Sequence, residues 1–158
     1  MWELWLIAFW ILTLGLAWYP CCGGACTHCS GSTPSTVSCV FTASVATCGA
    51  CFDSGETYVL AWSSDCTWIG VGTMTCTGPD DLDIGITATI VPRAPTHCRW
   101  EVSMILVDPL FPGDTQFFTY YGSDETSPID CTAEAILTDV SADVTPNFCQ
   151  HDGDCTLN

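Results

Sequence analysis

Thirteen cysteines in 158 residues constrain the fold of this chain more than any other feature of its sequence. Seven of them lie between Cys21 and Cys51, and the other six stand singly along the rest of the chain. Single cysteines at long intervals are typical of an extracellular domain that is cross-linked by disulfides. We therefore expect a disulfide-rich domain, whose candidate bonding residues are Cys21, Cys22, Cys26, Cys29, Cys39, Cys48, Cys51, Cys66, Cys76, Cys98, Cys131, Cys149 and Cys155.

The same cluster admits a zinc site as the alternative. The pairs Cys26-x2-Cys29 and Cys48-x2-Cys51 are separated by 18 residues, a spacing that double-knuckle zinc sites use, and four thiolates could surround one ion tetrahedrally. The six single cysteines would have no part in such a site, so we prefer disulfides and expect no resident metal. Because thirteen is odd, at least one cysteine lacks a partner within the chain, and spacing cannot give the connectivity.

The charge balance limits the partners of the chain. It has no lysine, two arginines and eighteen acidic residues, which gives a formal charge of −16. Such a surface repels nucleic acid and anionic lipid, so we expect neither as a partner. Calcium is the one candidate cofactor, although no EF-hand pattern is present. A strongly negative surface that keeps an exported protein soluble is the simpler interpretation, and the candidate calcium ligands are Asp80, Asp81, Asp83, Asp152 and Asp154.

The N-terminal segment is apolar from Trp2 to Tyr19 except for Glu3 and Thr13. Eighteen helical residues span roughly 27 Å, which is marginal for the hydrocarbon core of a bilayer. The segment could be a signal peptide, a retained membrane anchor or a helix buried in an assembly. We expect an apolar signal or anchor helix over residues 1–20, with membrane contact only through residues 2–19, and a location that is extracellular, on a cell surface or on a virion.

The rest of the chain alternates between apolar and polar residues with a period of two, which predicts β-strands. We expect a cysteine-rich loop over residues 21–35 and a β domain over residues 36–158. Seven or eight short strands with turns between them predict an antiparallel β-sandwich or jelly roll. The tail beyond Pro146 is polar and is expected to be tied down by a cysteine, and the expected strands are 36–47, 57–62, 66–77, 82–91, 98–107, 115–121 and 131–140.

One face of the expected strands supplies the predicted core. Residues on alternate positions of a strand share a face, so a slip of one residue would invert every assignment. The side chains predicted to fill the space between two sheets are Phe41, Tyr58, Leu60, Ile84, Ile86, Trp100, Val102 and Met104.

No catalytic motif stands out in this sequence. The three histidines, His28, His97 and His151, lie outside any nucleophile-elbow or zinc-protease pattern. Acidic residues in turns are common for reasons of turn geometry alone. We therefore expect a protein that is not an enzyme.

The motifs from Cys26 to Cys76 follow one another in a distinctive order: Cys-x2-Cys, a Ser/Thr-rich strand, Cys-x2-Cys, a turn, Thr-Tyr-Val-Leu, Cys-x-Trp and Cys. This order resembles small cysteine-rich secreted β-domain proteins of planctomycete-type bacteria and tailed phages. The resemblance covers about a third of the chain. It implies an exported or virion-associated β domain and carries over no catalytic residue.

These observations support three hypotheses about function. The first is a structural or adhesive β domain displayed outside a cell or on a virion, which binds copies of itself or surface and virion proteins. The second is a pilin-like filament subunit that retains its N-terminal apolar helix. The third is a secreted module that binds carbohydrate or another ligand through exposed tryptophan and tyrosine.

We expect the domain to depend on its disulfides, because each bridge that closes a loop of tens of residues contributes roughly 2–4 kcal/mol, comparable with the net stability of a domain. Thermal unfolding with and without a reductant measures this dependence, and the Tm should fall on reduction. An unchanged Tm would contradict the disulfide interpretation. Unfolding by EDTA rather than by reductant would favour the zinc alternative.

Overall fold

The computed structural model describes residues 26–46, 56–75, 81–107, 110, 115–140 and 151–158. The expected helix over residues 1–20 lies outside the described residues, as do Cys21, Cys22, Cys48, Cys51, Cys76 and Cys149. Within the described ranges, no helix is long and apolar enough to cross a membrane. The strands are β1 (Thr36–Ala46), β2 (Thr57–Ser64), β3 (Thr67–Met74), β4 (Leu82–Ala94), β5 (His97–Val107), β6 (Thr115–Tyr121), β7 (Glu125–Thr126), β8 (Ala135–Asp139) and β9 (His151–Leu157).

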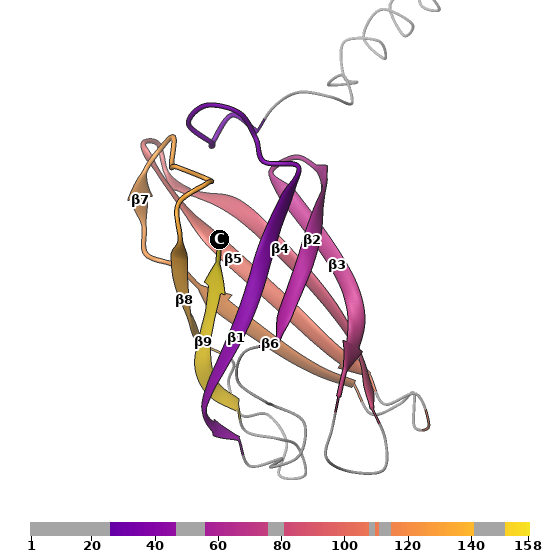
Figure 1. Ribbon diagram of the computed structural model, residues 1–158. Helices are drawn as coiled ribbons and strands as arrows, with labels where there is room; N and C mark the ends of the chain where they lie inside the picture. The colour runs from indigo at the N-terminus through magenta and orange to yellow at the C-terminus, as the bar shows by residue number, and fades with distance from the viewer. Residues whose placement is uncertain (1–25, 47–55, 76–80, 108–109, 111–114, 141–150) are drawn as a thin grey trace, which may run out of the picture.

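The strands form one antiparallel sheet that closes into an eight-stranded barrel (Figure 1). Around the barrel the order is β1, β2, β3, β4, β5, β6, β8 and β9, and β9 pairs with β1 to complete the ring. The short strand β7 pairs with β5 beside it. The prediction of an all-β antiparallel fold is therefore confirmed.

The barrel replaces the expected sandwich of two sheets. Strands β4 and β5 share a long ladder from Asp83–Val107 to Ala94–His97, and β9 bonds to β8 as well as to β1. These pairings leave no point in the ring at which two sheets could separate. The alternation of apolar residues is the same in a sandwich and in a small barrel, so the sequence pattern could not distinguish them.

The C-terminal tail was expected to be a polar segment and is instead the strand that closes the barrel. Among the described side chains of β9, Cys155 and Leu157 point into the core, and both are buried. Two hydrogen bonds complete the pairing, because the backbone amides of Ser38 and Asn158 each donate to the carbonyl of the other, at 2.7 and 3.1 Å. The sequence of β9 contains too few apolar residues for its alternation to be recognised.

The last predicted strand, 131–140, is shorter in the structure because a turn precedes it. The carboxylate of Asp130 accepts hydrogen bonds from the backbone amide and the hydroxyl of Thr132, at 3.0 and 2.7 Å. The amide of Ala133 donates to the carbonyl of Asp130 at 3.1 Å. These bonds hold residues 130–133 in a turn, and β8 begins only at Ala135.

Two other strand boundaries differ for local reasons. Strand β3 begins at Thr67 rather than Cys66, because Asp65 and Cys66 have φ of 46° and 61° and form the tight turn after β2. Strand β4 continues past Val91 to Ala94, and its ladder with β5 becomes irregular between Pro92 and Ala94. An irregular ladder at the strand end accommodates the proline, which has no amide to donate.

Side chains fill the inside of the barrel, as in other small barrels. The predicted core is confirmed: seven of its eight members are buried, and Tyr58 is half-buried and packs against them. Burial and a hydrogen bond that the Tyr58 hydroxyl donates to Glu56 raise the pKa of Tyr58. The larger buried side chains are Phe41, Leu60, Trp68, Met74, Ile84, Ile86, Ile90, Trp100, Val102, Met104, Leu106, Phe118, Tyr120, Leu137 and Leu157.

Aromatic side chains meet in two places in this core. The rings of Trp68 and Trp100 have their centroids 5.0 Å apart, and those of Phe41 and Tyr120 are 5.3 Å apart. These separations fall in the range in which tilted aromatic pairs attract each other. Elsewhere in the core Gly70 makes room for Leu60, since a Cβ at position 70 would lie 2.5 Å from the Cδ2 atom of Leu60.

Two isoleucines on opposite faces of the barrel wall test the packing of the core. Ile86 is 1% exposed and Ile136 is 62% exposed. We expect Ile86→Ala to lower the free energy of unfolding by about 2–5 kcal/mol, because it leaves a cavity, and Ile136→Ala to change it by less than about 0.5 kcal/mol. Chemical denaturation of both variants measures the difference. Equal losses would contradict the assignment of the faces.

Candidate functional site

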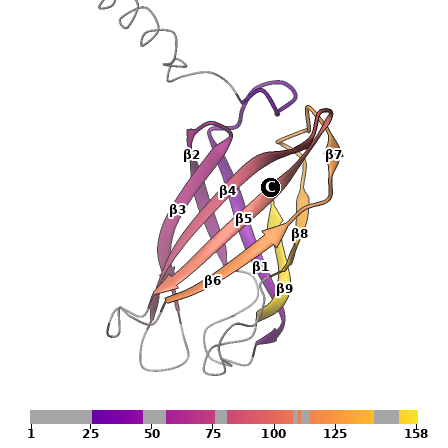
Figure 2. The same cartoon turned by 180° about the vertical axis from the view of Figure 1, so that it is seen from behind.

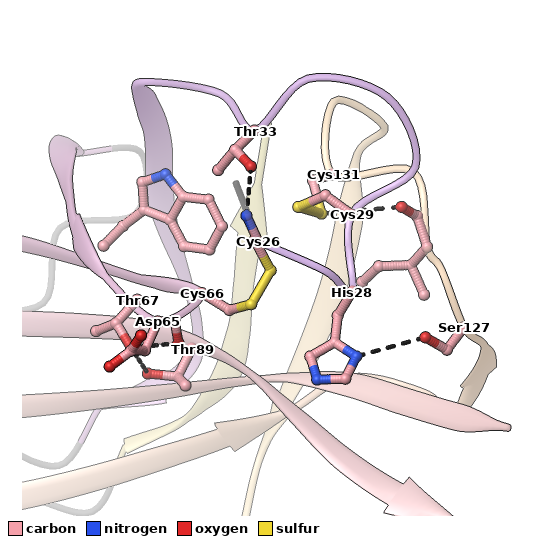
Figure 3. Close-up of a disulfide and its surroundings, with 12 residues drawn as sticks. Cys26, His28, Cys29, Thr33, Asp65, Cys66, Thr67, Thr89, Ser127 and Cys131 are labelled. Carbon is pink, nitrogen blue, oxygen red and sulfur yellow. Dashed lines mark hydrogen bonds between the residues drawn. A yellow bond between two sulfur atoms is a disulfide. The ribbon is translucent and has the colours of Figure 1, made fainter. Parts of the chain in front are cut away.

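One end of the barrel is covered by two chain segments, residues 26–35 and 127–131, which we call the cap (Figures 1 and 3). Cys29 and Ile129 form an isolated parallel bridge between them. The amide of Ser30 donates to the carbonyl of Ile129 at 2.7 Å, and the amide of Ile129 donates to the carbonyl of His28 at 2.8 Å. The two segments therefore act as one unit.

Two disulfides attach the first cap segment, residues 26–35, to connections on opposite sides of the barrel. Cys26 bonds to Cys66 in the turn between β2 and β3, and Cys29 bonds to Cys131 in the connection between β6 and β8. In the ring order these two connections lie across the barrel from each other. The Cys26–Cys29 turn, closed by a hydrogen bond from the amide of Cys29 to the carbonyl of Cys26, is thus a brace across the barrel end.

Hydrogen bonds fix the remainder of the segment 26–35 to the barrel wall. The hydroxyl of Thr33 accepts a bond from the amide of Cys26 at 2.8 Å. The indole Nε1 of Trp68 donates to the carbonyl of Pro34 at 2.9 Å, and the amide of Trp62 donates to the carbonyl of Ser35 at 2.8 Å. A loop held at this many points is a rigid part of the fold rather than a free lid.

The cap contains the one histidine–serine contact among the described residues. The Nδ1 atom of His28 lies 3.4 Å from the hydroxyl of Ser127 (Figure 3). A nucleophilic serine needs a histidine that a third group orients, and within the described ranges no carboxylate contacts His28. His97 contacts Thr96 at 3.1 Å in an exposed position, and the side chain of His151 is outside the described part. We interpret the contact of His28 with Ser127 as a tie between the two cap segments.

The candidate metal ligands that the structure describes do not form a group. Among the described residues, no three histidine, cysteine, aspartate or glutamate side chains form a group that could hold an ion. The sulfurs of Cys26 and Cys29, half of the predicted zinc set, are bonded to Cys66 and Cys131. Cys48, Cys51, Asp80 and the side chain of Asp152 lie outside the described part, while Asp81 and Asp83 are exposed at β4 and Asp154 is on β9.

A second candidate site is a row of apolar side chains on the outside of the barrel. The pairing register places Val71 of β3 opposite Gly85 of β4, Gly85 opposite Ile105 of β5, and Ile105 opposite Phe117 of β6. Ala61 pairs with Ile69, and continuing that register by two residues puts Val59 of β2 opposite Val71. The row thus crosses five neighbouring strands, of which β3 to β6 cross the front of Figure 2.

The side chains of this row are strongly exposed. Val71 is 85% exposed, Phe117 is 67%, Val59 is 63% and Ile105 is 38%. Single exposed apolar residues are ordinary, whereas a contiguous set indicates an interaction surface.

The rows on either side of it are nearly free of charge. Together with the apolar row they make fifteen outward positions, and Asp83 is the one charged residue among them. The whole chain has twenty charged residues. We call these three rows the outer face. Half of the ten flanking positions are threonine. They are Ala61, Ile69, Thr87, Ser103 and Thr119 in one row and Thr57, Thr73, Asp83, Val107 and Thr115 in the other.

Of the tryptophans expected to bind a ligand, the three that the structure describes are not strongly exposed. Trp68 and Trp100 are buried and Trp62 is half-buried. The large exposed aromatic side chain of the described residues is Phe117, and half-buried Tyr121 is stacked under the guanidinium of Arg99, 3.9 Å from its ring centroid. The sequence could not reveal the outer face, because its members are isolated apolar residues that only the strand register brings together.

No protein-family model matches the chain, and neither a curated protein nor a solved structure is significantly similar to it.

Removing one disulfide of the cap should loosen it without opening the barrel. In Cys29→Ala/Cys131→Ala we expect the free energy of unfolding to fall by about 2–4 kcal/mol. Hydrogen exchange should accelerate at the amides of Ser30 and Ile129, while the amides of β4 and β5 keep their protection relative to global unfolding. Cys98→Ala, which alters a buried cysteine that takes part in neither disulfide, is the control. Uniform loss of protection throughout the barrel would contradict a separate cap.

Proposed function

We propose that this protein is a non-enzymatic structural or adhesive domain, displayed outside a cell or on a virion, that works by binding copies of itself. The observation that carries this proposal is the outer face. It is a contiguous surface with an apolar row at its centre and Asp83 as its one charged member, and it lies on regular strands that hold its side chains in fixed positions.

The filled interior, the disulfides and the closed ring of strands support a role outside a cell or on a virion. Its interior is filled by side chains, so a ligand would have to bind on the outside. Its end is braced by two disulfides, which persist in oxidising surroundings and are compatible with an extracellular location. A closed ring of strands resists aggregation through strand edges, which favours a domain exposed at high local concentration.

Charge favours a second copy as the occupant of the outer face. Each chain carries a formal charge of −16, so two copies repel each other across most contacts, and the repulsion is weakest where charged side chains are absent. A basic partner would instead be expected to bind where acidic side chains are dense. The outer face offers such a partner only Asp83.

The shape of the face is also self-complementary. Gly85 leaves a notch in the apolar row, since a Cβ at this position would have no atom within 4 Å. Beside the notch stands Val71, the most exposed apolar side chain of the described residues. A two-fold axis brings the same surface of two copies together, so that a residue of one copy contacts a different residue of the other and the reverse contact also forms. In such a dimer Val71 of each copy can enter the notch at Gly85 of the other.

Substitutions at the knob and at the notch test the proposal in the intact protein. We expect a dimer whose affinity falls at least about tenfold in Val71→Glu, which sets two carboxylates near the axis, and in Gly85→Val, which fills the notch in open space. Ile136→Glu, a substitution at another exposed apolar residue, outside the three rows, should leave the affinity unchanged. Sedimentation velocity over a range of concentrations measures all four proteins.

A monomer at every concentration would refute the self-association. If the three substitutions changed the affinity equally, or if none of them changed it, the copies would have to meet through another surface. The Tm of each variant serves as the control, and a value near that of the wild type verifies that the barrel is intact.

A further inference from the structure

Two buried cysteines meet where the barrel closes. The sulfur atoms of Cys39 in β1 and Cys155 in β9 lie 2.7 Å apart, and neither residue has any exposed surface. They belong to the first and the last strand of the barrel, and their positions are 116 apart in the sequence. Neither takes part in the two disulfides of the cap.

The strand register explains why the two sulfurs meet. Cys39 is opposite Leu157, and Phe41 is opposite Cys155, so the two cysteines are diagonal neighbours on the inward face. Diagonal side chains on adjacent strands remain within reach of each other. The 2.7 Å between the two sulfurs is already close to the bonding distance of about 2.05 Å.

We propose that Cys39 and Cys155 form a third disulfide, which locks the first strand of the barrel to the last. The bond arises by exchange with a disulfide oxidant of the exporting compartment, either a small disulfide or a protein thiol oxidase. The thiolate of one cysteine breaks the oxidant's S–S bond and forms a mixed disulfide, and the second cysteine then displaces the oxidant's remaining sulfur. Two thiols of this chain are oxidised, and two thiols of the oxidant are released.

The surroundings determine when this bond can form. Contact with the Cys39 sulfur and burial raise the pKa of the Cys155 thiol, so the thiolate that exchange requires is disfavoured once the barrel is closed. The oxidant also cannot touch a sulfur that has no exposed surface. The exchange therefore takes place before β9 settles on β1, or while that pairing is open, and closure then protects the bond.

Cys98 is the matched control for this inference. It is also fully buried and lies on an inward position of β5, but no other described sulfur contacts it. Burial alone therefore does not make a pair, and the effect of losing a buried cysteine can be measured separately.

Mapping the bonds of the native full chain tests the proposal. Free thiols are alkylated in denaturant without reductant, and the protein is digested with pepsin at low pH, where disulfide exchange stops. We expect a cross-linked peptide that contains Cys39 and Cys155, both in the wild type and in Cys98→Ala. Recovery of Cys39 or Cys155 as an alkylated thiol, or bonded to another cysteine, would overturn the proposal.

Two further measurements concern the lock itself. We expect Cys39→Ala/Cys155→Ala to lower the Tm by about 10 °C or more, and by clearly more than Cys98→Ala does. In the native wild type the bond should resist dithiothreitol and become reducible when denaturant is added. Equal Tm losses in the two variants, or reduction at the same rate with and without denaturant, would contradict a buried lock between β1 and β9.

Discussion

The pairing of β9 with β1 is the contact on which the rest of the structure depends. Without it the sheet would have two free edges and an exposed row of unpaired amides and carbonyls along each of them. With it, every strand of the ring has a neighbour on both sides, and the inward side chains enclose a common core. Because β9 is the last strand in the sequence, this contact forms only after the whole chain is available. Non-local closure of this kind is costly in chain entropy, which gives cross-links between distant residues a large effect.

The cap complements this closure at the end of the barrel. Its disulfides join positions separated by 40 and 102 residues, and they reach the ring at two opposite points. Side-chain packing alone would leave the end of a small barrel accessible to water and its connections free to move. The short Cys26–Cys29 turn joins those connections, and farther along the same segment the carbonyl of Pro34 accepts a hydrogen bond from the indole of Trp68, a core residue. Residues 26–35, the described part of the cysteine-rich loop, are therefore part of the barrel's architecture.

The sequence predicted the parts of the fold that depend on local alternation. The buried residues follow a strict period of two from Ile84 to Ile90 in β4 and from Cys98 to Leu106 in β5, and the expected core agreed with the observed one. Strand β9 was missed because its sequence, with His151, Asp152 and Asp154, is mostly polar, and two apolar residues are too few to reveal an alternating pattern. The closure of the sheet into a barrel was missed because it depends on the pairing of β9 with β1. The sequence of a single strand does not reveal its partner. The outer face was missed for the same reason: Val71, Gly85 and Ile105 become neighbours only through the register.

The placement of the C-terminal residue has a mechanical consequence. Asn158 exchanges two backbone hydrogen bonds with Ser38, near the start of β1. A force that pulls the start of β1 and the end of β9 apart would therefore break the hydrogen bonds between these strands one after another. After three residues of β9 have separated, the opening would reach Cys155 and its neighbour Cys39. A pull applied on the N-terminal side of Cys26 meets the cap first and passes through its covalent bonds to the far connections of the ring. A force applied on the N-terminal side of Cys26 therefore acts mainly on the two disulfides and on the barrel connections that they join. The hydrogen bonds of β1 carry little of this force.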